Sequence, residues 1–280
     1  MTFVTRFAPS PTGCLHRGHA FSALTAFRAA GEANGRFLLR IEDIDATRCR
    51  PEYDAAILED LAWLGVDWEQ PVRRQSNHLA DYHAAIETLR KRGLVYRCFK
   101  TRKEIDIGRA PHEPTAAYVG APLPVDKEAE RLERGEAFAW RLSLAAAREA
   151  LGGFENLTFV EQGAGPNGET GVVQARPETA GDIVLARKDV GVAYHLAVVH
   201  DDALQGVTHV IRGLDLFEAA HIQRLLQALL DLPTPTYRHH GLLLGPDGKR
   251  YAKRDRAQTL RELRASGMSA TDLRTELGFQ

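Results

Sequence analysis

The first forty residues alternate apolar and polar positions in a way that predicts a strand, a helix and a second strand. Residues 3–7 form a short apolar-rich strand candidate, and the apolar residues of 18–35 then recur with the spacing of one helix face. An Asn-Gly pair ends this helix, and residues 36–41 form a second, buried strand candidate. Such units build parallel sheets, whose ligands bind beyond the carboxyl ends of the strands.

The rest of the chain divides by texture. Two helices that pack on a sheet are expected at 51–65 and 78–93, followed by short strands between Pro- and Gly-rich turns. Strand patterns return, and we expect strands at 181–186, 192–199 and 207–213 and a helix at 217–230. We therefore expect an α/β fold in which one parallel-sheet domain is split by an inserted domain, with the parts 1–93, 94–180, 181–245 and 246–280.

Composition narrows the class of protein. The 280 residues are 44% hydrophobic and 26% charged, which is typical of a soluble globular protein, and no apolar run is long enough for a membrane span. We therefore expect a cytoplasmic protein with no membrane partner. The three cysteines, Cys14, Cys49 and Cys98, lack CxxC spacing, so they predict neither a disulfide framework nor a zinc finger.

The net charge of −1 means that a nucleic acid would have to bind a local basic patch. Residues 90–103 are one candidate for such a patch, although a solvated face at a helix end is the commoner meaning of a charge run.

Two histidines lie where the first strand gives way to the helix, in the stretch RFAPSPTGCLHRGHA. A helix that starts after Leu15 places His16 and His19 one turn apart at its N-terminus, where free N–H groups and a positive partial charge favour phosphate. Gly18 lets a ligand approach the backbone closely. The structural alternative is that His16 merely caps the helix.

Three further stretches carry candidate chemistry. In the basic segment 249–255, Lys253 is a candidate to stabilise the negative charge that develops on a phosphoryl group during its transfer. The alternative is that this segment is a surface turn without a role in catalysis. The acidic segment 40–45 follows the second strand, where a carboxylate could hold a substrate ammonium group, although an exposed loop acid is the commoner outcome. Tyr194 and Arg212 are placed at the ends of two further strands, and Arg212 suits a carboxylate ligand, with a surface ion pair as its alternative.

Together, RFAPSPTG, LRIEDID, VVHDD, HVIRG and GPDGKRYAKRD resemble the catalytic core of class I glutamyl-tRNA synthetases, in order and spacing. The resemblance implies a Rossmann-like nucleotide-binding domain and an enzyme that forms an aminoacyl-adenylate. It implies that the HIGH-type and KMSKS-type signatures act on ATP through His16, Gly18, His19 and Lys253, with His16, His19 and Lys253 catalytic. It implies that glutamate is held by Arg6, Phe7, Ala8, Pro9, Ser10, Glu42, Tyr194 and Arg212.

The chain ends at Gln280, soon after the lysine segment, where glutamyl-tRNA synthetases continue into an anticodon-binding domain. In this it resembles the glutamyl-Q tRNA(Asp) synthetase subfamily. The resemblance implies ATP with Mg²⁺, L-glutamate, and transfer to queuosine in the anticodon of tRNA(Asp). Two alternatives stay open: a truncated synthetase that charges a tRNA 3′ end or another carrier, and a non-catalytic tRNA-binding relative.

The sequence departs from the family pattern at several places. Arg17 replaces an apolar residue of the first signature, and His195 stands where Asn is frequent. Many subfamily members carry a zinc site, but here Cys98 lacks its cysteine partners and Lys100 replaces one of them. We expect no structural zinc and no other resident metal. Because no long apolar helix seam is visible, we also expect a monomer.

Overall fold

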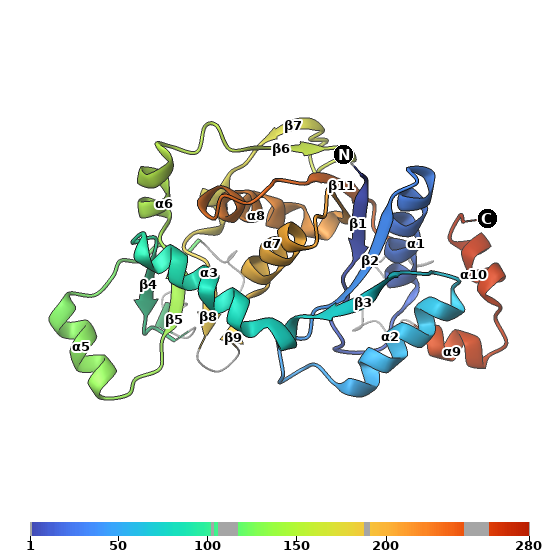
Figure 1. Cartoon of the computed structure of the whole chain (residues 1–280), viewed down its shortest axis with the longest axis horizontal. Helices are drawn as coiled ribbons and strands as arrows, with labels where there is room; N and C mark the ends of the chain where they lie inside the picture. Colours follow the sequence, from blue (N-terminus) through green and yellow to red (C-terminus); the bar gives the residue numbers. More distant parts are fainter. Residues whose placement is uncertain (1, 102–103, 106–116, 188–190, 244–257, 280) are drawn as a thin grey trace.

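The N-terminal strand, helix and strand form as the periodicity predicts. The computed structural model describes residues 2–101, 104–105, 117–187, 191–243 and 258–279 (Figure 1). Strand β1 (Val4–Phe7) pairs in parallel with β2 (Arg36–Ile41), and helix α1 (Arg17–Glu32) connects them. Strand β3 (Glu69–Arg74) joins the other side of β2, also in parallel. The carboxyl ends of β1 and β2 therefore lie at one edge, where α1 begins.

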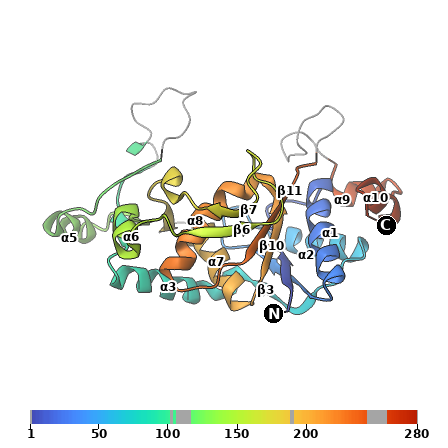
Figure 2. The same cartoon turned by 90° about the horizontal axis from the view of Figure 1, so that it is seen from above.

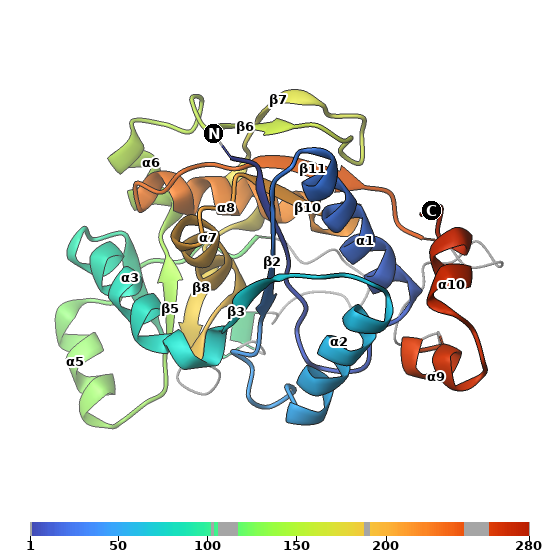
Figure 3. The same ribbon diagram turned by 45° about the vertical axis from the view of Figure 1, so that its right-hand side comes forward.

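A second group of strands continues this arrangement. Strands β10 (His209–Gly213) and β11 (Thr236–His240) pair in parallel. The backbone N–H of Thr208, just before β10, donates to the carbonyl of Val4 on β1 over 2.9 Å. This contact places β10 beside β1, on the side away from β2. Helices α7 (Tyr194–Leu204) and α8 (Phe217–Leu229) lie beside the strands, as Figures 1 and 3 show.

The middle of the chain contributes to two sheets. Strands β4, β5, β8 and β9 form an antiparallel sheet, while β6 pairs antiparallel with β7 and parallel with β11. Along the chain, helix α3 precedes β4, and α5 and α6 come before and after β5 (Figure 1). Helices α5 and α6 lie toward the end of the molecule away from α1 (Figure 2). The bounds are α3 Leu79–Lys91, β4 Val95–Cys98, α5 Val125–Glu133, β5 Ala139–Leu142, α6 Leu144–Leu151, β6 Thr158–Glu161, β7 Gly171–Gln174, β8 Val184–Arg187 and β9 Gly191–Val192.

The strand expected at 192–199 is wrong. Strand β9 ends at Val192, and helix α7 begins at Tyr194. A short apolar run is compatible with a buried strand and with a buried helix, so periodicity alone could not separate the two. Helix α7 is buried over much of its circumference, and for that reason lacks the polar stripe of a surface helix. Tyr194 therefore lies at a helix start and not at a strand end.

Two short helices end the described chain and pack beside α1 and α2 (Pro51–Trp63), as Figure 1 shows. Helix α9 (Leu260–Ala265) and helix α10 (Ala270–Glu276) each begin with a capping box. Leu260, Leu263 and Leu273 are buried in the same apolar cluster as the inner face of α1. No helix in the described ranges is both long and apolar enough to cross a bilayer.

The buried carboxyl of Asp60, on α2 facing α9, predicts an unusual pH dependence of stability. Asp60 is 1% exposed, and Arg264 lies 3.9 Å from its Oδ1 atom. Burial raises the pKa of Asp60 to about 6 against 3.8 for an ordinary Asp, although Arg264 and Arg261 oppose the rise. Because the folded state holds this proton more tightly than the unfolded state, the contribution of Asp60 to stability is lost as the pH rises from 4 through 6.

We therefore expect Asp60→Asn to raise the free energy of unfolding at pH 8 by about 1–3 kcal/mol, and to change it little at pH 4. Urea unfolding at both pH values measures the difference. Glu59→Gln, which removes the exposed neighbouring carboxylate, is the control and should be neutral within about 0.5 kcal/mol. An equal effect of Asp60→Asn on the free energy of unfolding at both pH values would contradict a raised pKa of Asp60 in the folded state.

Candidate active site

A cavity of about 630 Å³ opens at the carboxyl ends of β1, β2 and β10, beside the start of α1. Its wall brings together eleven of the twelve residues singled out from the sequence: Arg6, Phe7, Ala8, Pro9, Ser10, His16, Gly18, His19, Glu42, Tyr194 and Arg212. The twelfth, Lys253, lies outside the described residues. The wall also contains residues that the sequence did not single out, among them Thr12, Ser22, Asp215 and His240.

The hydrogen bonds at the start of α1 define which ring nitrogen of each histidine carries the proton. The backbone N–H of Gly18 donates to Nδ1 of His16 over 3.1 Å, and the N–H of His16 donates to Nδ1 of His19 over 3.2 Å. A ring nitrogen that accepts carries no proton, so each neutral imidazole holds its proton on Nε2. The ring centroids lie 3.8 Å apart. His16 does cap the helix, as the structural alternative held, and it also lines the cavity.

Gly18 lies close to the His16 ring. A Cβ atom at position 18 would stand 3.0 Å from Cε1 and 3.2 Å from Nδ1 of His16, closer than ordinary van der Waals contact. We expect Gly18→Ala to displace the ring by a few tenths of an ångström and to lower glutamate-dependent ATP–pyrophosphate exchange about tenfold. The far-UV circular dichroism should be unchanged. Wild-type exchange in this variant would show that the ring position is unimportant.

The loop after β1 is held by groups of β2 and α7. The N–H of Glu42 donates to the carbonyl of Pro9 over 3.0 Å, which fixes the loop at the end of β2. Nε and Nη2 of the buried Arg6 side chain donate to the two carboxylate oxygens of Asp202 over 3.0 and 3.4 Å. Asp202 lies on α7, so one ion pair joins the first strand to a helix almost two hundred residues later in the chain.

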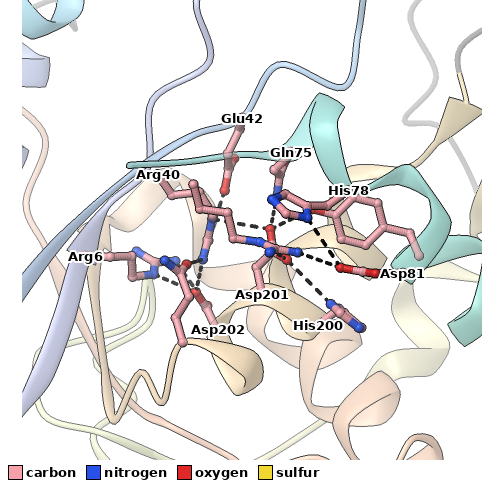
Figure 4. Close-up of polar contacts among 12 residues, drawn as sticks. Arg6, Arg40, Glu42, Gln75, His78, Asp81, His200, Asp201 and Asp202 are labelled. Atoms are coloured by element: carbon pink, nitrogen blue, oxygen red, sulfur yellow. Dashed lines mark hydrogen bonds and ion pairs between the residues drawn. The ribbon is translucent and has the colours of Figure 1, made fainter. Parts of the chain in front are cut away.

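Arg40 extends this ion pair into a buried network (Figure 4). Its side chain is 0% exposed and donates through Nη1 to Asp202 over 2.7 Å and through Nη2 to Glu42 over 3.1 Å. Burial opposes the charge of Arg40, but Asp202, Glu42 and Asp201 outweigh it, and the pKa of Arg40 is raised. Burial also raises the pKa of Glu42, which Arg40 and Arg6 offset only in part. A further cation beside Glu42 would therefore be stabilising.

Asp201 anchors the neighbouring helix in the same network. Its Oδ2 atom accepts from the Tyr82 hydroxyl over 2.8 Å and from Nε2 of Gln75 over 3.0 Å, while Oδ1 accepts from Nε of Arg73 over 2.9 Å. The VVHDD motif that contains Asp201 and Asp202 contributed to the resemblance, but neither residue was predicted to belong to the site. The available signal was the HDD triplet, two consecutive acidic residues that continue an apolar run and are both buried in the structure.

Arg212 is buried at the end of β10 and contacts uncharged groups. Its Nε donates to Nε2 of His239 over 3.0 Å, Nη1 to Oε1 of Gln223 over 2.9 Å, and Nη2 to the carbonyl of Leu216 over 2.9 Å. The alternative of a surface ion pair is therefore wrong, since the side chain is buried and lines the cavity. A carboxylate ligand would complement this charge.

Tyr194 and His195 stand together at the start of α7. Burial raises the pKa of Tyr194, so its hydroxyl stays protonated. Burial, aided by the charge of Arg212, lowers the pKa of His195 to about 4, which keeps this ring neutral at physiological pH. Tyr194 lines the cavity, whereas His195 is absent from the described lining.

Described residues before and after 244–257, the part of the chain that contains Lys253, lie near the cavity. Leu242 and Leu243 line it. Thr259 forms an antiparallel bridge with His16, and the N–H of Leu260 donates to the carbonyl of Leu15 over 2.8 Å.

A second cavity of about 470 Å³ adjoins the first and shares Ser10, Thr12, Glu42 and Tyr194 with it. Its other walls come from the loop after β2, from Gln75 and from β8 and β9, so it opens toward the antiparallel sheet. Its polar lining includes the side chains of Asp45, Arg48 and Arg187.

The structure describes part of the candidate basic patch, residues 90–103, and the surroundings of Cys98. Arg90 pairs with Glu87 over 2.6 Å and Arg97 pairs with Glu128, so two of the described positive charges of 90–103 already have acidic partners, while Arg92 donates to a backbone carbonyl. The Sγ atom of Cys98 lies 3.9 Å from the Tyr118 hydroxyl. Within the described ranges, no group of three or more His, Cys, Asp or Glu side chains could hold a metal ion.

Comparison with known proteins identifies the family. Residues 2–277 match the model of the catalytic domain of class I tRNA synthetases for E and Q. A glutamyl-Q tRNA(Asp) synthetase from Rhodobacter capsulatus is 48% identical, over 99% of this chain and 100% of that protein. The chain belongs to the glutamyl-Q tRNA(Asp) synthetases. A second member, from Nocardia farcinica, is 43% identical over 94% of this chain and 80% of its own length.

A solved glutamate tRNA ligase from Elizabethkingia meningosepticum, in complex with its amino acid, superposes with a TM-score of 0.76 at 29% identity. The match covers 91% of this chain and 52% of that one, so this member of the glutamyl-Q tRNA(Asp) synthetases spans about half the length of the ligase. These comparisons confirm the predicted family, the predicted α/β fold of class I type and the prediction that the chain is a ligase.

Proposed function

We propose that the chain activates L-glutamate with ATP to form glutamyl-adenylate, and transfers the glutamyl group to queuosine in the anticodon of tRNA(Asp). One observation carries this proposal. A single cavity has two imidazoles at a helix N-terminus in one part of its wall and a buried guanidinium with uncharged partners in another. The first arrangement suits phosphate, and the second suits a carboxylate.

In the first step, an oxygen of the α-carboxylate of glutamate attacks the α-phosphorus of ATP, and pyrophosphate leaves. The Nε2–H groups of His16 and His19 would donate to phosphate oxygens as negative charge moves toward pyrophosphate. Lys253 would supply a further positive charge, since Leu243, which precedes its segment, lines the cavity and Thr259, which follows it, pairs with His16. No covalent bond to the protein is needed, so positioning and charge stabilisation supply the catalysis.

Glutamate would lie between the loop after β1 and Arg212. Arg6, Phe7, Ala8, Pro9 and Ser10 would hold the α-amino and α-carboxylate groups together with Glu42. Glu42, whose pKa burial raises, would gain a compensating charge from the substrate ammonium. Arg212 would bind the side-chain carboxylate beside Tyr194, and a neutral amino acid would leave this buried charge unmatched.

Mg²⁺ would enter with ATP. Its preferred ligands are carboxylate, phosphate and water oxygens, and Asp215 offers a carboxylate in the cavity wall, so the residues present fit the ion. When bound, Mg²⁺ neutralises phosphate charge. We propose no structural zinc.

In the second step, a hydroxyl of the queuosine cyclopentene-diol attacks the carbonyl carbon of the mixed anhydride, and AMP leaves. The second cavity, which shares Ser10, Glu42 and Tyr194 with the first, would admit the acceptor nucleoside. The tRNA phosphates on either side of this nucleoside would contact basic residues. Residues 90–103 are still only a predicted binding site for these phosphates. We propose that the enzyme acts as a monomer in the cytoplasm, where charged nucleotides and tRNA are available.

Two linked assays test the proposal. ATP–pyrophosphate exchange that depends on glutamate, measured without tRNA, is expected and would exclude a non-catalytic tRNA-binding protein. Transfer of labelled glutamate is then compared between tRNA(Asp) with queuosine and tRNA(Asp) without it. Transfer only to the modified tRNA is expected. Equal transfer to both would favour charging of a 3′ end.

A further inference from the structure

On the side of Arg212 away from β1 lie two buried residues that have no role in the chemistry described so far. His239 is on β11, directly beside Arg212 in the parallel register, and Glu161 ends β6, the next strand of the same sheet. The side chains of His239 and Glu161 are both 0% exposed, and His239 Nδ1 lies 2.6 Å from Glu161 Oε2. We call Arg212, His239 and Glu161 the arginine relay.

The hydrogen bonds of the relay can run in only one direction. A guanidinium nitrogen can donate but cannot accept, so Nε2 of His239 must accept from Nε of Arg212 over 3.0 Å. The ring proton is therefore on Nδ1, which donates to Oε2 of Glu161. The other oxygen, Oε1, accepts from the backbone N–H of His239 over 2.9 Å and of Gly163 over 2.7 Å.

The negative charge of Glu161 compensates the positive charge of Arg212 through the neutral ring of His239. The three groups that touch Arg212 are uncharged, whereas Glu161 carries a negative charge on the far side of a neutral imidazole. Burial opposes this negative charge, but the hydrogen bonds from His239 and Gly163 outweigh it and lower the pKa of Glu161. Burial lowers the pKa of His239, so the ring stays neutral.

The relay also fixes the plane of the guanidinium. Arg carries five N–H donors in a rigid fork, and the three contacts above use one on each nitrogen. The remaining N–H groups belong to Nη1 and Nη2, the pair that binds a carboxylate with two parallel hydrogen bonds.

We propose that His239 and Glu161 are positioning residues that hold Arg212 in the orientation that selects the side-chain carboxylate of glutamate over the amide of glutamine. This inference rests on the proposed function, because it assigns a role to groups behind the proposed glutamate site. It makes Glu161, a residue of the inserted segment, part of amino-acid selection.

Glu161→Gln tests the relay through the imidazole tautomer. The two backbone N–H groups require an oxygen at the Oε1 position, so the NH₂ group of the introduced amide would face Nδ1 of His239. The NH₂ group donates, so His239 would have to move its proton to Nε2. That proton would then face the Nε–H of Arg212, two donors would oppose each other, and the guanidinium would turn away.

We expect Glu161→Gln to raise KM for glutamate in pyrophosphate exchange by roughly 10- to 100-fold, the loss expected for a hydrogen bond to a charged group. KM for ATP should stay within about twofold, and the preference for glutamate over glutamine should narrow by a similar factor to the rise in KM. Glu218→Gln, which neutralises an exposed acidic residue at the start of α8, is the matched control and should behave as wild type. A general loss of structure would instead lower exchange at all substrate concentrations.

The tautomer is measurable in the unmodified enzyme, which keeps the test independent of how the variant folds. Long-range ¹H–¹⁵N correlations of the histidine rings, with His239→Gln to assign the signal, should show the proton of His239 on Nδ1. A proton on Nε2, or wild-type glutamate kinetics in a folded Glu161→Gln variant, would overturn the relay. Absence of exchange in the wild-type enzyme would instead overturn the proposed function, so the two failures are distinguishable.

Discussion

Arg212→Met is expected to lower kcat/KM for glutamate in pyrophosphate exchange about a thousandfold. Removal of one member of a desolvated charge pair costs about 4 kcal/mol, and each 1.4 kcal/mol is about a factor of ten. Methionine fills a similar volume but offers no charge to the substrate carboxylate. It also leaves Oε1 of Gln223 and the carbonyl of Leu216 without their donor.

The substitution Arg212→Met should change the kinetic constants for glutamate and leave those for ATP nearly unchanged. KM for ATP is expected to stay within about threefold, because the phosphates would lie at the start of α1. The variant should also lose its preference for glutamate over glutamine. Arg238→Met, which removes an exposed arginine from the neighbouring strand β11, is the matched control and should retain wild-type kinetics. A drop of less than tenfold for Arg212→Met, with the fold intact, would mean that another cation binds the carboxylate.

Arg40→Met is expected to lower the free energy of unfolding by about 3–5 kcal/mol. Arg40 is fully buried, and its loss leaves Glu42 and Asp202 inside the protein with less compensating charge. Burial of an unpaired carboxylate costs far more than burial of a matched pair. Urea denaturation measures the change. Exchange activity should fall as well, because the same network holds Arg6 and Glu42 at the cavity.

Arg36→Met is the matched control on the same strand. Arg36 forms a two-pronged ion pair with Glu69, at 2.6 and 2.7 Å, but both side chains are nearly half exposed. Water already solvates these charges, so the loss should be at most about 1 kcal/mol. Equal destabilisation by the two substitutions would show that the buried network is not what stabilises this part of the fold.

The N-terminal part of the fold was predictable because its signals are local. A helix face with regular apolar spacing and an Asn-Gly stop define α1, and the strands on either side are short apolar runs. Helix α7 was missed because a buried helix shows no polar stripe. The pairing of β6 with β11 joins Glu161 to Tyr237, and no local pattern in either segment specifies such a distant neighbour.

The candidate site divides in the same way. Most residues on the cavity wall could be named because they belong to short ordered motifs that resemble those of a known family. The roles of the residues that support them could not be assigned, because each acts through a distant partner: Asp202 on Arg6 and Arg40, and Glu161 through His239 on Arg212. Sequence motifs identify groups that face a ligand, whereas the groups that orient them depend on tertiary packing.

A crystal structure of the enzyme with a non-hydrolysable analogue of glutamyl-adenylate tests most directly whether one cavity binds both the adenylate and the glutamate side chain. The side-chain carboxylate should lie within about 3 Å of Nη1 and Nη2 of Arg212. The phosphate-mimicking group of the analogue should lie beside Nε2 of His16 and His19, with the ammonium of Lys253 on the same side. Binding of the analogue in another cavity, or contact of its side-chain carboxylate with a different cation, would rule out the proposed site.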